Sequence, residues 1–297
     1  MLKKSYVSGN KIFTFIIISS IFSIILNELL PEIYLLGFFL VLVLFFGIIH
    51  GANDIYLIIN SSKNRKSISK MTIFYVIIVL IITLCFFSSP SISLIFFILF
   101  SCYHFGEQQW TILDDNNHSN FFFFLYGLLI FSTIFFFNKN EVIEVVFKIT
   151  KRPIKQEFFN WLLATSFCLN LLISFLNFKK IKNQLINQII LYPLIVLVSY
   201  KLSLFNSFAM YFVFFHSIPS IFEQTKFLYG SCNFSHFKKY LFTAFPYWAF
   251  AIIGLFLFYV FFSDNLSFSL DIFFSFLAAI TFPHVIVIYK MKKMSNH

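Results

Sequence analysis

The chain has 297 residues, of which 59% are hydrophobic and only 11% are charged, and its formal net charge is +10. A soluble domain of this length carries roughly a quarter charged residues, so the composition excludes a soluble globular protein and indicates an integral membrane protein. Lysine and arginine lie mainly in loops and at the ends of apolar runs. This pattern is typical of membrane orientation and of contact with anionic lipid, not of nucleic-acid binding.

Apolar segments long enough to cross a bilayer follow one another along the chain. A spanning helix needs about 20 mostly apolar residues, and the sequence predicts an all-α, polytopic integral membrane helical bundle of about 8–10 transmembrane helices. The candidate spans lie near residues 12–30, 33–59, 71–88, 91–112, 121–137, 157–176, 185–203, 205–222, 241–262 and 268–289. The divisions at 88–91 and 203–205 are the weakest, which leaves eight or nine spans open. No linker could hold a soluble domain, so we expect residues 1–297 to form a single integral membrane domain.

The first apolar segment has the basic start and apolar core of a signal sequence, but it lacks a small-residue cleavage site. We therefore expect it to be retained as the first helix. Basic residues precede the first span and follow the second, sixth and tenth spans, which predicts that both termini are cytoplasmic. The connection 138–156 disagrees, because it carries five basic residues yet would lie outside. Its paired apolar residues between charges predict a short helix on the membrane surface.

Four of the seven histidines are embedded in apolar segments, namely His50, His104, His216 and His284. The other three, His118, His236 and His297, lie in polar loops or at the end of the chain. The embedded histidines belong to the second, fourth, eighth and tenth spans, which run in the same direction, and each lies roughly five to ten residues before the same end of its helix. Four imidazoles at one depth would suit a metal at the centre of a bundle. The alternative is that each is a neutral imidazole bonded to a neighbouring helix.

Polar residues follow three of these histidines at helical spacing. Asp54 comes four residues after His50, Glu107 comes three after His104, and Ser220 comes four after His216. A carboxylate one turn from a metal-binding histidine commonly accepts the other ring N–H and so fixes the tautomer. These residues are therefore candidates for supporting or catalytic roles, Asp54 toward His50 in particular. The alternative is that the carboxylates only approach the lipid headgroups.

The four histidines as ligands restrict which metal ion could bind. Imidazole ligands suit Zn, Cu, Fe or Ni, but the HExxH motif of zinc proteases and the paired histidine boxes of membrane desaturases are absent from the sequence. A mononuclear Fe(2+) with four histidines and free positions for dioxygen fits best. Haem with two histidine ligands stays open, and we predict no other bound cofactor.

The motifs around these histidines are similar to those of a known family. HGAND followed by IYLI, then YHFGEQ, FHSIPS and TFPH resemble, in the family's order, the bacteriorhodopsin-related (Brp/Blh) family of membrane β-carotene 15,15′-dioxygenases. The resemblance covers about residues 40–290. It implies an iron-dependent carotenoid cleavage enzyme that splits the central double bond of β-carotene with O2 to give two all-trans-retinal. Some members carry a second histidine where this chain has Ser220, which leaves open whether His284 completes the ligand set.

The resemblance also implies the partners: an apolar carotenoid from the bilayer, O2, membrane lipids and, as one acceptor of the product, a retinal-binding rhodopsin. The expected location is the bacterial inner membrane, and the expected role is retinal biosynthesis. Two alternatives from other classes stay open. The intramembrane His, Asp and Glu residues could serve a transporter or a proton relay, or two histidines could bind haem in a redox protein.

Overall fold

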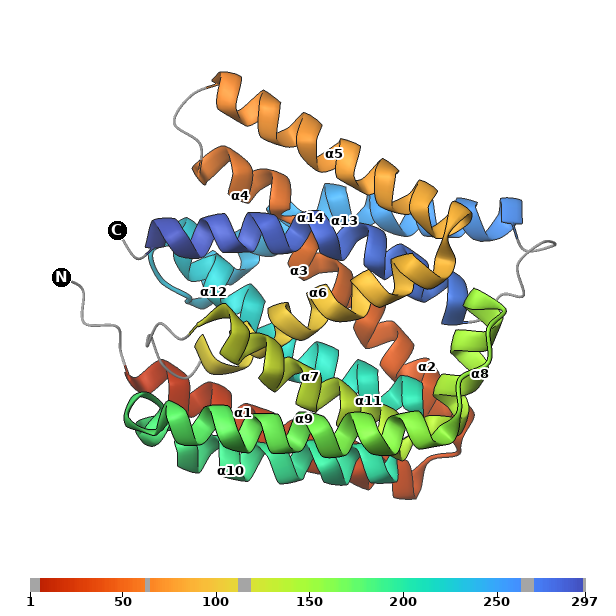
Figure 1. The fold of residues 1–297 in the computed structure, drawn as a ribbon. Helices are drawn as coiled ribbons and strands as arrows, with labels where there is room; N and C mark the ends of the chain where they lie inside the picture. Colours follow the sequence, from red (N-terminus) through yellow and green to blue (C-terminus); the bar gives the residue numbers. More distant parts are fainter. Residues whose placement is uncertain (1–5, 62–64, 112–118, 263–269, 296–297) are drawn as a thin grey trace. The chain divides into compact units, whose positions relative to one another are not determined.

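The computed structural model describes residues 6–61, 65–111, 119–262 and 270–295. These residues are helical almost throughout, and none of them lies in a strand (Figure 1). Nine helices in the described part of the chain are long and apolar enough to cross a membrane. The predicted all-α, multi-pass membrane architecture is thus confirmed.

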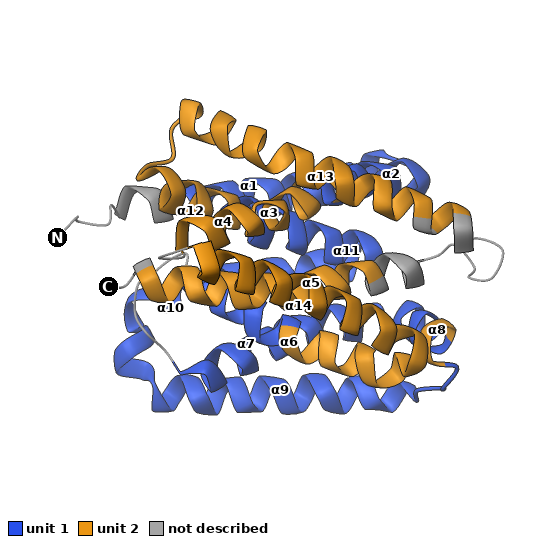
Figure 2. Cartoon of the chain, turned by 90° about the horizontal axis from the view of Figure 1, so that it is seen from above, with its two compact units in different colours: residues 1–43, 101–147, 151–219 blue, residues 44–100, 148–150, 220–297 orange. Residues whose placement is uncertain are grey.

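The chain divides into two compact units, and both units are assembled from separate stretches of sequence. Unit 1 contains residues 1–43, 101–147 and 151–219, and unit 2 contains residues 44–100, 148–150 and 220–297 (Figure 2). Long helical runs therefore begin in one unit and end in the other. The expectation of a single integral membrane domain over residues 1–297 stays a prediction.

Unit 1 is built around α7, which packs against α9 and α10. Its elements are α1 (Tyr6–Leu29), α2 (Glu32–Leu42), the second half of α6 (Pro90–Thr111), α7 (Asn120–Phe137), most of α8 (Lys139–Thr150), α9 (Gln156–Leu176), α10 (Phe178–Lys201), α11 (Leu204–Met210) and the π-helix η2 (Tyr211–Ser217). Buried polar groups join these helices. Asn170 Nδ2 on α9 donates to the Leu125 carbonyl on α7 at 2.7 Å, and the hydroxyls of Ser132 and Ser166 lie 2.7 Å apart. Such bonds hold apolar helices together in lipid, where no hydrophobic force does so.

In unit 2, α13 packs against α3, and α14 packs against α5 and α4. Its elements are the π-helix η1 (Val43–Gly47), α3 (Ile48–Ala52), α4 (Asp54–Ser61), α5 (Arg65–Ser88), the first half of α6, most of α12 (Ile218–Tyr229), α13 (Phe234–Phe262) and α14 (Leu270–Ser295). A cluster of Leu57, Ile58, Val287, Ile288 and Met291 fills the space between α4 and α14.

Two of the predicted spans are not simple helices. The second, predicted at 33–59, consists of α2, η1, α3 and α4, with a break at Asn53. The eighth, predicted at 205–222, consists of α11, η2 and α12 and continues to Tyr229. A helix does cover most of 138–156 as expected, namely α8, whose place on the membrane surface stays a prediction. The tenth predicted span begins at 268, outside the described residues, and α14 covers the rest.

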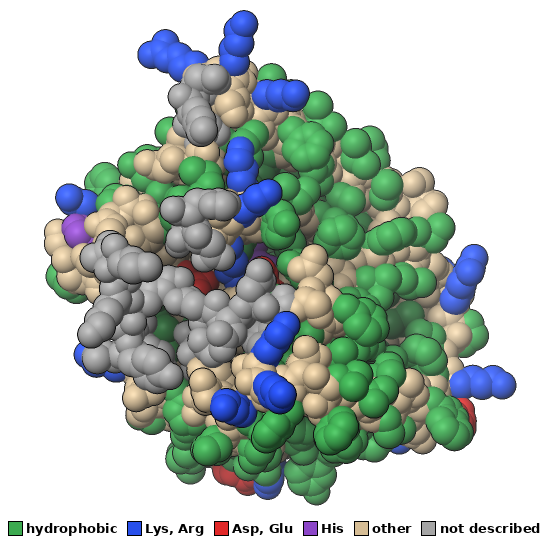
Figure 3. All heavy atoms as spheres, turned by 60° about the vertical axis from the view of Figure 1, so that its left-hand side comes forward, with side chains coloured by type: hydrophobic (Ala, Val, Ile, Leu, Met, Phe, Trp, Pro, Cys, Tyr) green, Lys and Arg blue, Asp and Glu red, His purple; other side chains and the backbone are tan. Residues whose placement is uncertain are grey.

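The surface of both units is strongly apolar. Large side chains such as Phe250, Trp161 and Leu84 are 79%, 70% and 66% exposed. Figure 3 shows hydrophobic side chains over much of one face, with Lys and Arg side chains standing among them. A water-facing surface rarely carries apolar patches of this size, so these helices present their side chains to lipid.

Basic residues lie at helix ends in both units. In unit 1, the start of α1, which carries Lys11, lies at the same end as the turn between α9 and α10 with Lys179 (Figure 1). Lys139 at the start of α8 and Lys201 at the end of α10 lie at the opposite end, so basic residues occupy both ends of this unit. In unit 2, the start of α5 lies at the same end as the last turn of α14 with Lys293 (Figure 1). The expectation that both termini are cytoplasmic stays a prediction.

Candidate metal centre

Both π-helices lie next to embedded histidines. The π-helix η1 ends at Gly47, three residues before His50, and η2 contains His216 itself. Ser217 Oγ donates to the Phe212 carbonyl, five residues back, at 2.8 Å. A π-helix adds one residue to an α-helical turn and is found frequently at functional sites. It changes the direction in which the following side chains point.

In unit 2, the structure brings His50 and His284 together. His50 lies on α3 and His284 on α14, and their ring centroids are 4.8 Å apart with planes at 85°. One ring nitrogen of each lies within 4.8 Å of the other. Both side chains are buried, with 6% and 3% exposed.

Asp54 bonds to His284. Its Oδ1 lies 2.8 Å from His284 Nδ1, and both side chains are buried. Because a carboxylate only accepts, His284 donates through Nδ1–H, and Nε2 is then the ring nitrogen that carries the lone pair. The expected contact of Asp54 with His50 stays a prediction, and the helix breaks between these two residues at Asn53 (φ −84°, ψ 5°).

In unit 1, the structure pairs His104 with His216. Their ring centroids are 4.7 Å apart with planes at 75°, and their side chains are only 1% and 2% exposed. Phe105 and Phe212 pack on the His216 ring, at centroid distances of 4.5 and 5.7 Å. Gln108 Nε2 donates to the His216 carbonyl at 3.2 Å, which ties α6 to η2.

A family model described as Beta-carotene 15,15'-dioxygenase matches residues 41–292. The chain belongs to this family. The match contains all four embedded histidines, confirms the resemblance seen in the motifs, and implies that the protein is a carotene dioxygenase acting with O2. No curated protein and no solved structure matches the chain.

The other expected supporting residues of the dioxygenase, Glu107 and Ser220, are both buried, and their supporting role stays a prediction. Glu107 is buried on α6, with 7% exposed. Ser220 is buried at the start of α12, and its Oγ accepts a hydrogen bond from Gln224 Nε2 at 3.0 Å. The described bond of Ser220 thus leads to Gln224, a residue that the sequence analysis did not single out.

The glycines near the histidines differ in the space that is left for a side chain. A Cβ at Gly51 would lie 3.7 Å from His284 Nδ1, an ordinary contact, so the position has room for alanine. A Cβ at Gly106 would overlap the carbonyl oxygen of Phe123, and one at Gly127 would overlap that of Cys102. Gly106 and Gly127 therefore allow the close approach of α6 and α7.

Several residues around His50 were missed from the sequence. Gln224, Tyr240 and Asn53 are fully buried and bond to one another or to the backbone at His50. The only available signal was that Asn53 and Gln224 are polar residues inside apolar segments. Among the histidines expected to be solvated, His236 is half-buried in the first turn of α13 and bonds to Ser231, and His118 and His297 lie outside the described residues.

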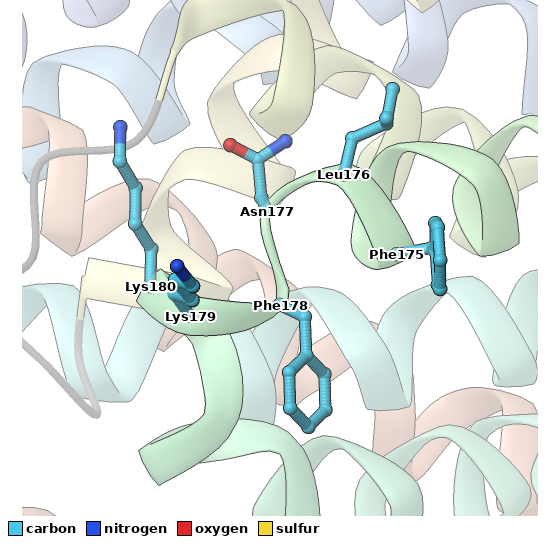
Figure 4. Close-up of a pocket in the computed structure, with 6 residues that line it drawn as sticks. All are labelled: Phe175, Leu176, Asn177, Phe178, Lys179 and Lys180. Carbon is cyan, nitrogen blue, oxygen red and sulfur yellow. The ribbon is translucent and has the colours of Figure 1, made fainter.

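The donors fit a metal ion of the kind that the family implies. Each unit contributes two buried imidazoles, and the Asp54 bond fixes the tautomer of one of them. Imidazole nitrogens suit iron as well as zinc, copper and nickel. A hollow elsewhere in unit 1, at the turn from α9 to α10, is lined by Phe175, Leu176, Asn177, Phe178, Lys179 and Lys180 (Figure 4). This lining offers no metal ligand, and we do not connect it with the centre.

Proposed function

We propose that this dioxygenase cleaves the central 15,15′ double bond of β-carotene with O2 and releases two all-trans-retinal. In this proposal a single Fe(2+) is held by His50, His104, His216 and His284. The observation that carries it is the burial of the four imidazoles as two close pairs, one in each unit, within a chain of this family.

The protein's part in the reaction is to bind, orient and keep out water. Iron, when bound, would supply the activation of O2. β-Carotene has no group that could exchange a proton, so apolar and aromatic side chains must position it. Phe105 and Phe212 pack on the His216 ring, Phe208 packs on both of these phenylalanines, and in this proposal the three rings help to position the substrate. The bond of Asp54 to Nδ1 of His284 would leave Nε2 to bind the metal.

We propose that the enzyme lies in the bacterial inner membrane with both termini in the cytoplasm, because basic residues precede the first predicted span and follow the second, sixth and tenth. Substrate and product are both apolar, and we propose that they pass through the surrounding lipid. A retinal-binding rhodopsin is a proposed acceptor of the product.

The first test is expression in a bacterium that accumulates β-carotene. The wild-type protein should bleach the cells and yield retinal. Alanine at any of the four embedded histidines should abolish retinal formation and lower the iron content of the purified protein. His236→Ala is the matched control and should retain both. Unchanged carotenoid in cells that contain well-inserted wild-type protein would overturn the proposal.

A further inference from the structure

The backbone around His50 receives side-chain hydrogen bonds from two other helices. Trp248 Nε1 on α13 donates to the Leu44 carbonyl in η1 at 2.8 Å. Gln224 Nε2 on α12 donates to the carbonyl of His50 itself at 2.9 Å. Backbone carbonyls inside an α-helix normally have a partner in the helix, so these side chains add bonds from other helices to this distorted segment.

Both the nitrogen and the oxygen of the Gln224 amide form hydrogen bonds. Its Nε2 bonds to the His50 carbonyl and to Ser220 Oγ, and its Oε1 accepts from the Tyr240 hydroxyl at 2.8 Å. Because the His50 carbonyl can only accept, the nitrogen of the amide must face it, and the orientation of the amide is fixed. Gln224 and Tyr240 are both 0% exposed. Water is therefore unable to replace either bond.

Tyr240 connects this amide to the backbone at His50 and to Asn53 at the helix break. Its hydroxyl, besides bonding to Gln224, lies 3.3 Å from the His50 carbonyl and 3.4 Å from that of Ile49. Asn53 Nδ2, at the break, donates back to the Tyr240 carbonyl at 3.0 Å. The segment from Leu44 to Asn53 is thereby bonded to α12 and α13 before, at and after His50.

We infer that Gln224, Tyr240 and Trp248 are positioning residues that fix the rotation of the helix segment bearing His50. Each residue of an α-helix turns the chain by about 100°, and a π-turn changes this register. The segment has a π-helix on one side and a break on the other, so its own helical bonds leave its rotation poorly determined. The three side chains determine it and so aim the His50 ring toward His284. This inference rests on the proposed metal-binding role of His50.

The test compares metal binding in variants that remove single donors. Gln224→Met removes the amide at similar volume, and Tyr240→Phe removes one oxygen atom. Asn170→Leu is the matched control, because it also removes a buried amide that donates to a carbonyl of another helix, at a pair of helices without histidine. Purified proteins are titrated with Fe(II) under anaerobic conditions, and the EPR spectrum of the nitric oxide complex is recorded.

Gln224→Met should weaken iron binding by about 10- to 100-fold and alter the rhombicity of the EPR signal, and Tyr240→Phe should alter the signal in the same direction. The kcat should fall while KM for β-carotene is unchanged. Asn170→Leu should lower the unfolding temperature but keep the wild-type affinity and spectrum. If Gln224→Met does not fold, Tyr240→Phe decides alone.

The outcome separates this inference from the proposed function. Wild-type iron affinity and spectrum in the Gln224 and Tyr240 variants, together with loss of iron in His50→Ala, would overturn the positioning role alone. Failure of the wild-type protein to bind iron would overturn the proposed metal site and this inference with it.

Discussion

The bond between Asp54 and His284 decides which nitrogen of one proposed ligand faces the metal. With Nδ1–H held by the carboxylate at 2.8 Å, Nε2 is the nitrogen left to bind. The sequence identified both residues, because each is an ionisable group inside an apolar run. It could not identify them as partners, since they are 230 residues apart and the break at Asn53 is invisible in the helical spacing.

Asp54→Asn should reduce iron affinity by about 10- to 100-fold, because the amide keeps the shape of the side chain but loses the charge that makes the imidazole a stronger ligand. Anaerobic iron titration measures the effect. Glu28→Gln is a suitable control, since it removes a carboxylate from an exposed ion pair with Lys201. Equal iron affinity in Asp54→Asn and wild type would show that the bond does not support the metal.

At the scale of helices, the apolar composition predicted where the spans lie. It did not predict the π-helices η1 and η2 or the break at Asn53. The runs that became η1 and η2, VLFFG and YFVFFHS, are as apolar as their α-helical neighbours. A hydrophobic pattern reports burial and length, and it does not distinguish an α-turn from a π-turn. The spans also extended beyond their apolar cores, as α13 does by starting at Phe234, because polar residues at the membrane boundary continue a helix.

The contact of α6 with α7 depends on two glycines. Gly106→Ala should destabilise the protein by about 1–3 kcal/mol, because the new methyl group forces two backbones apart. Gly51→Ala, beside His284, should have little effect on stability, since its methyl group makes only ordinary contacts. Thermal unfolding in detergent, followed by size-exclusion chromatography, measures both. An unfolding temperature equal to that of wild type in Gly106→Ala would contradict the close packing.

A carboxylate on α8 accepts a hydrogen bond from the first residue of α11. Glu141 Oε2 accepts a hydrogen bond from the Leu204 backbone N–H at 3.0 Å. Burial raises the pKa of the Glu141 carboxyl, and the charges of Glu32 and Glu144 raise it further, against the opposing effect of the Leu204 bond. The folded protein therefore binds this proton more tightly than the unfolded chain, so the contribution of Glu141 to stability falls as pH rises from the unfolded pKa through the raised folded pKa.

Glu141→Gln keeps an oxygen for the Leu204 N–H but cannot ionise. The difference in Tm, variant minus wild type, should increase as pH rises through this window and become constant above it. Thermal unfolding between about pH 4 and 8 covers the ordinary carboxyl range and the raised one. A difference that is independent of pH would contradict the shift.

At the scale of the whole molecule, the sequence predicted the class of protein and the four histidines but not their grouping. The order of the motifs along the chain was sufficient for the family, and the match over 41–292 confirmed it. The pairing of His50 with His284 and of His104 with His216 follows from two units that interleave along the chain, which helix counting does not reveal. The orientation predicted from the lysine and arginine residues at helix ends stays a prediction.

The central claim is that this membrane protein splits β-carotene symmetrically and needs iron to do so. The most direct measurement is product analysis of purified protein incubated with β-carotene and O2, after removal of iron by a chelator and again after addition of Fe(II). We expect retinal as the only aldehyde, with two molecules formed for each β-carotene consumed, and we expect its formation to be lost with the iron and restored by Fe(II). Unchanged β-carotene in the iron-loaded sample, or retinal formed equally without iron, would contradict it.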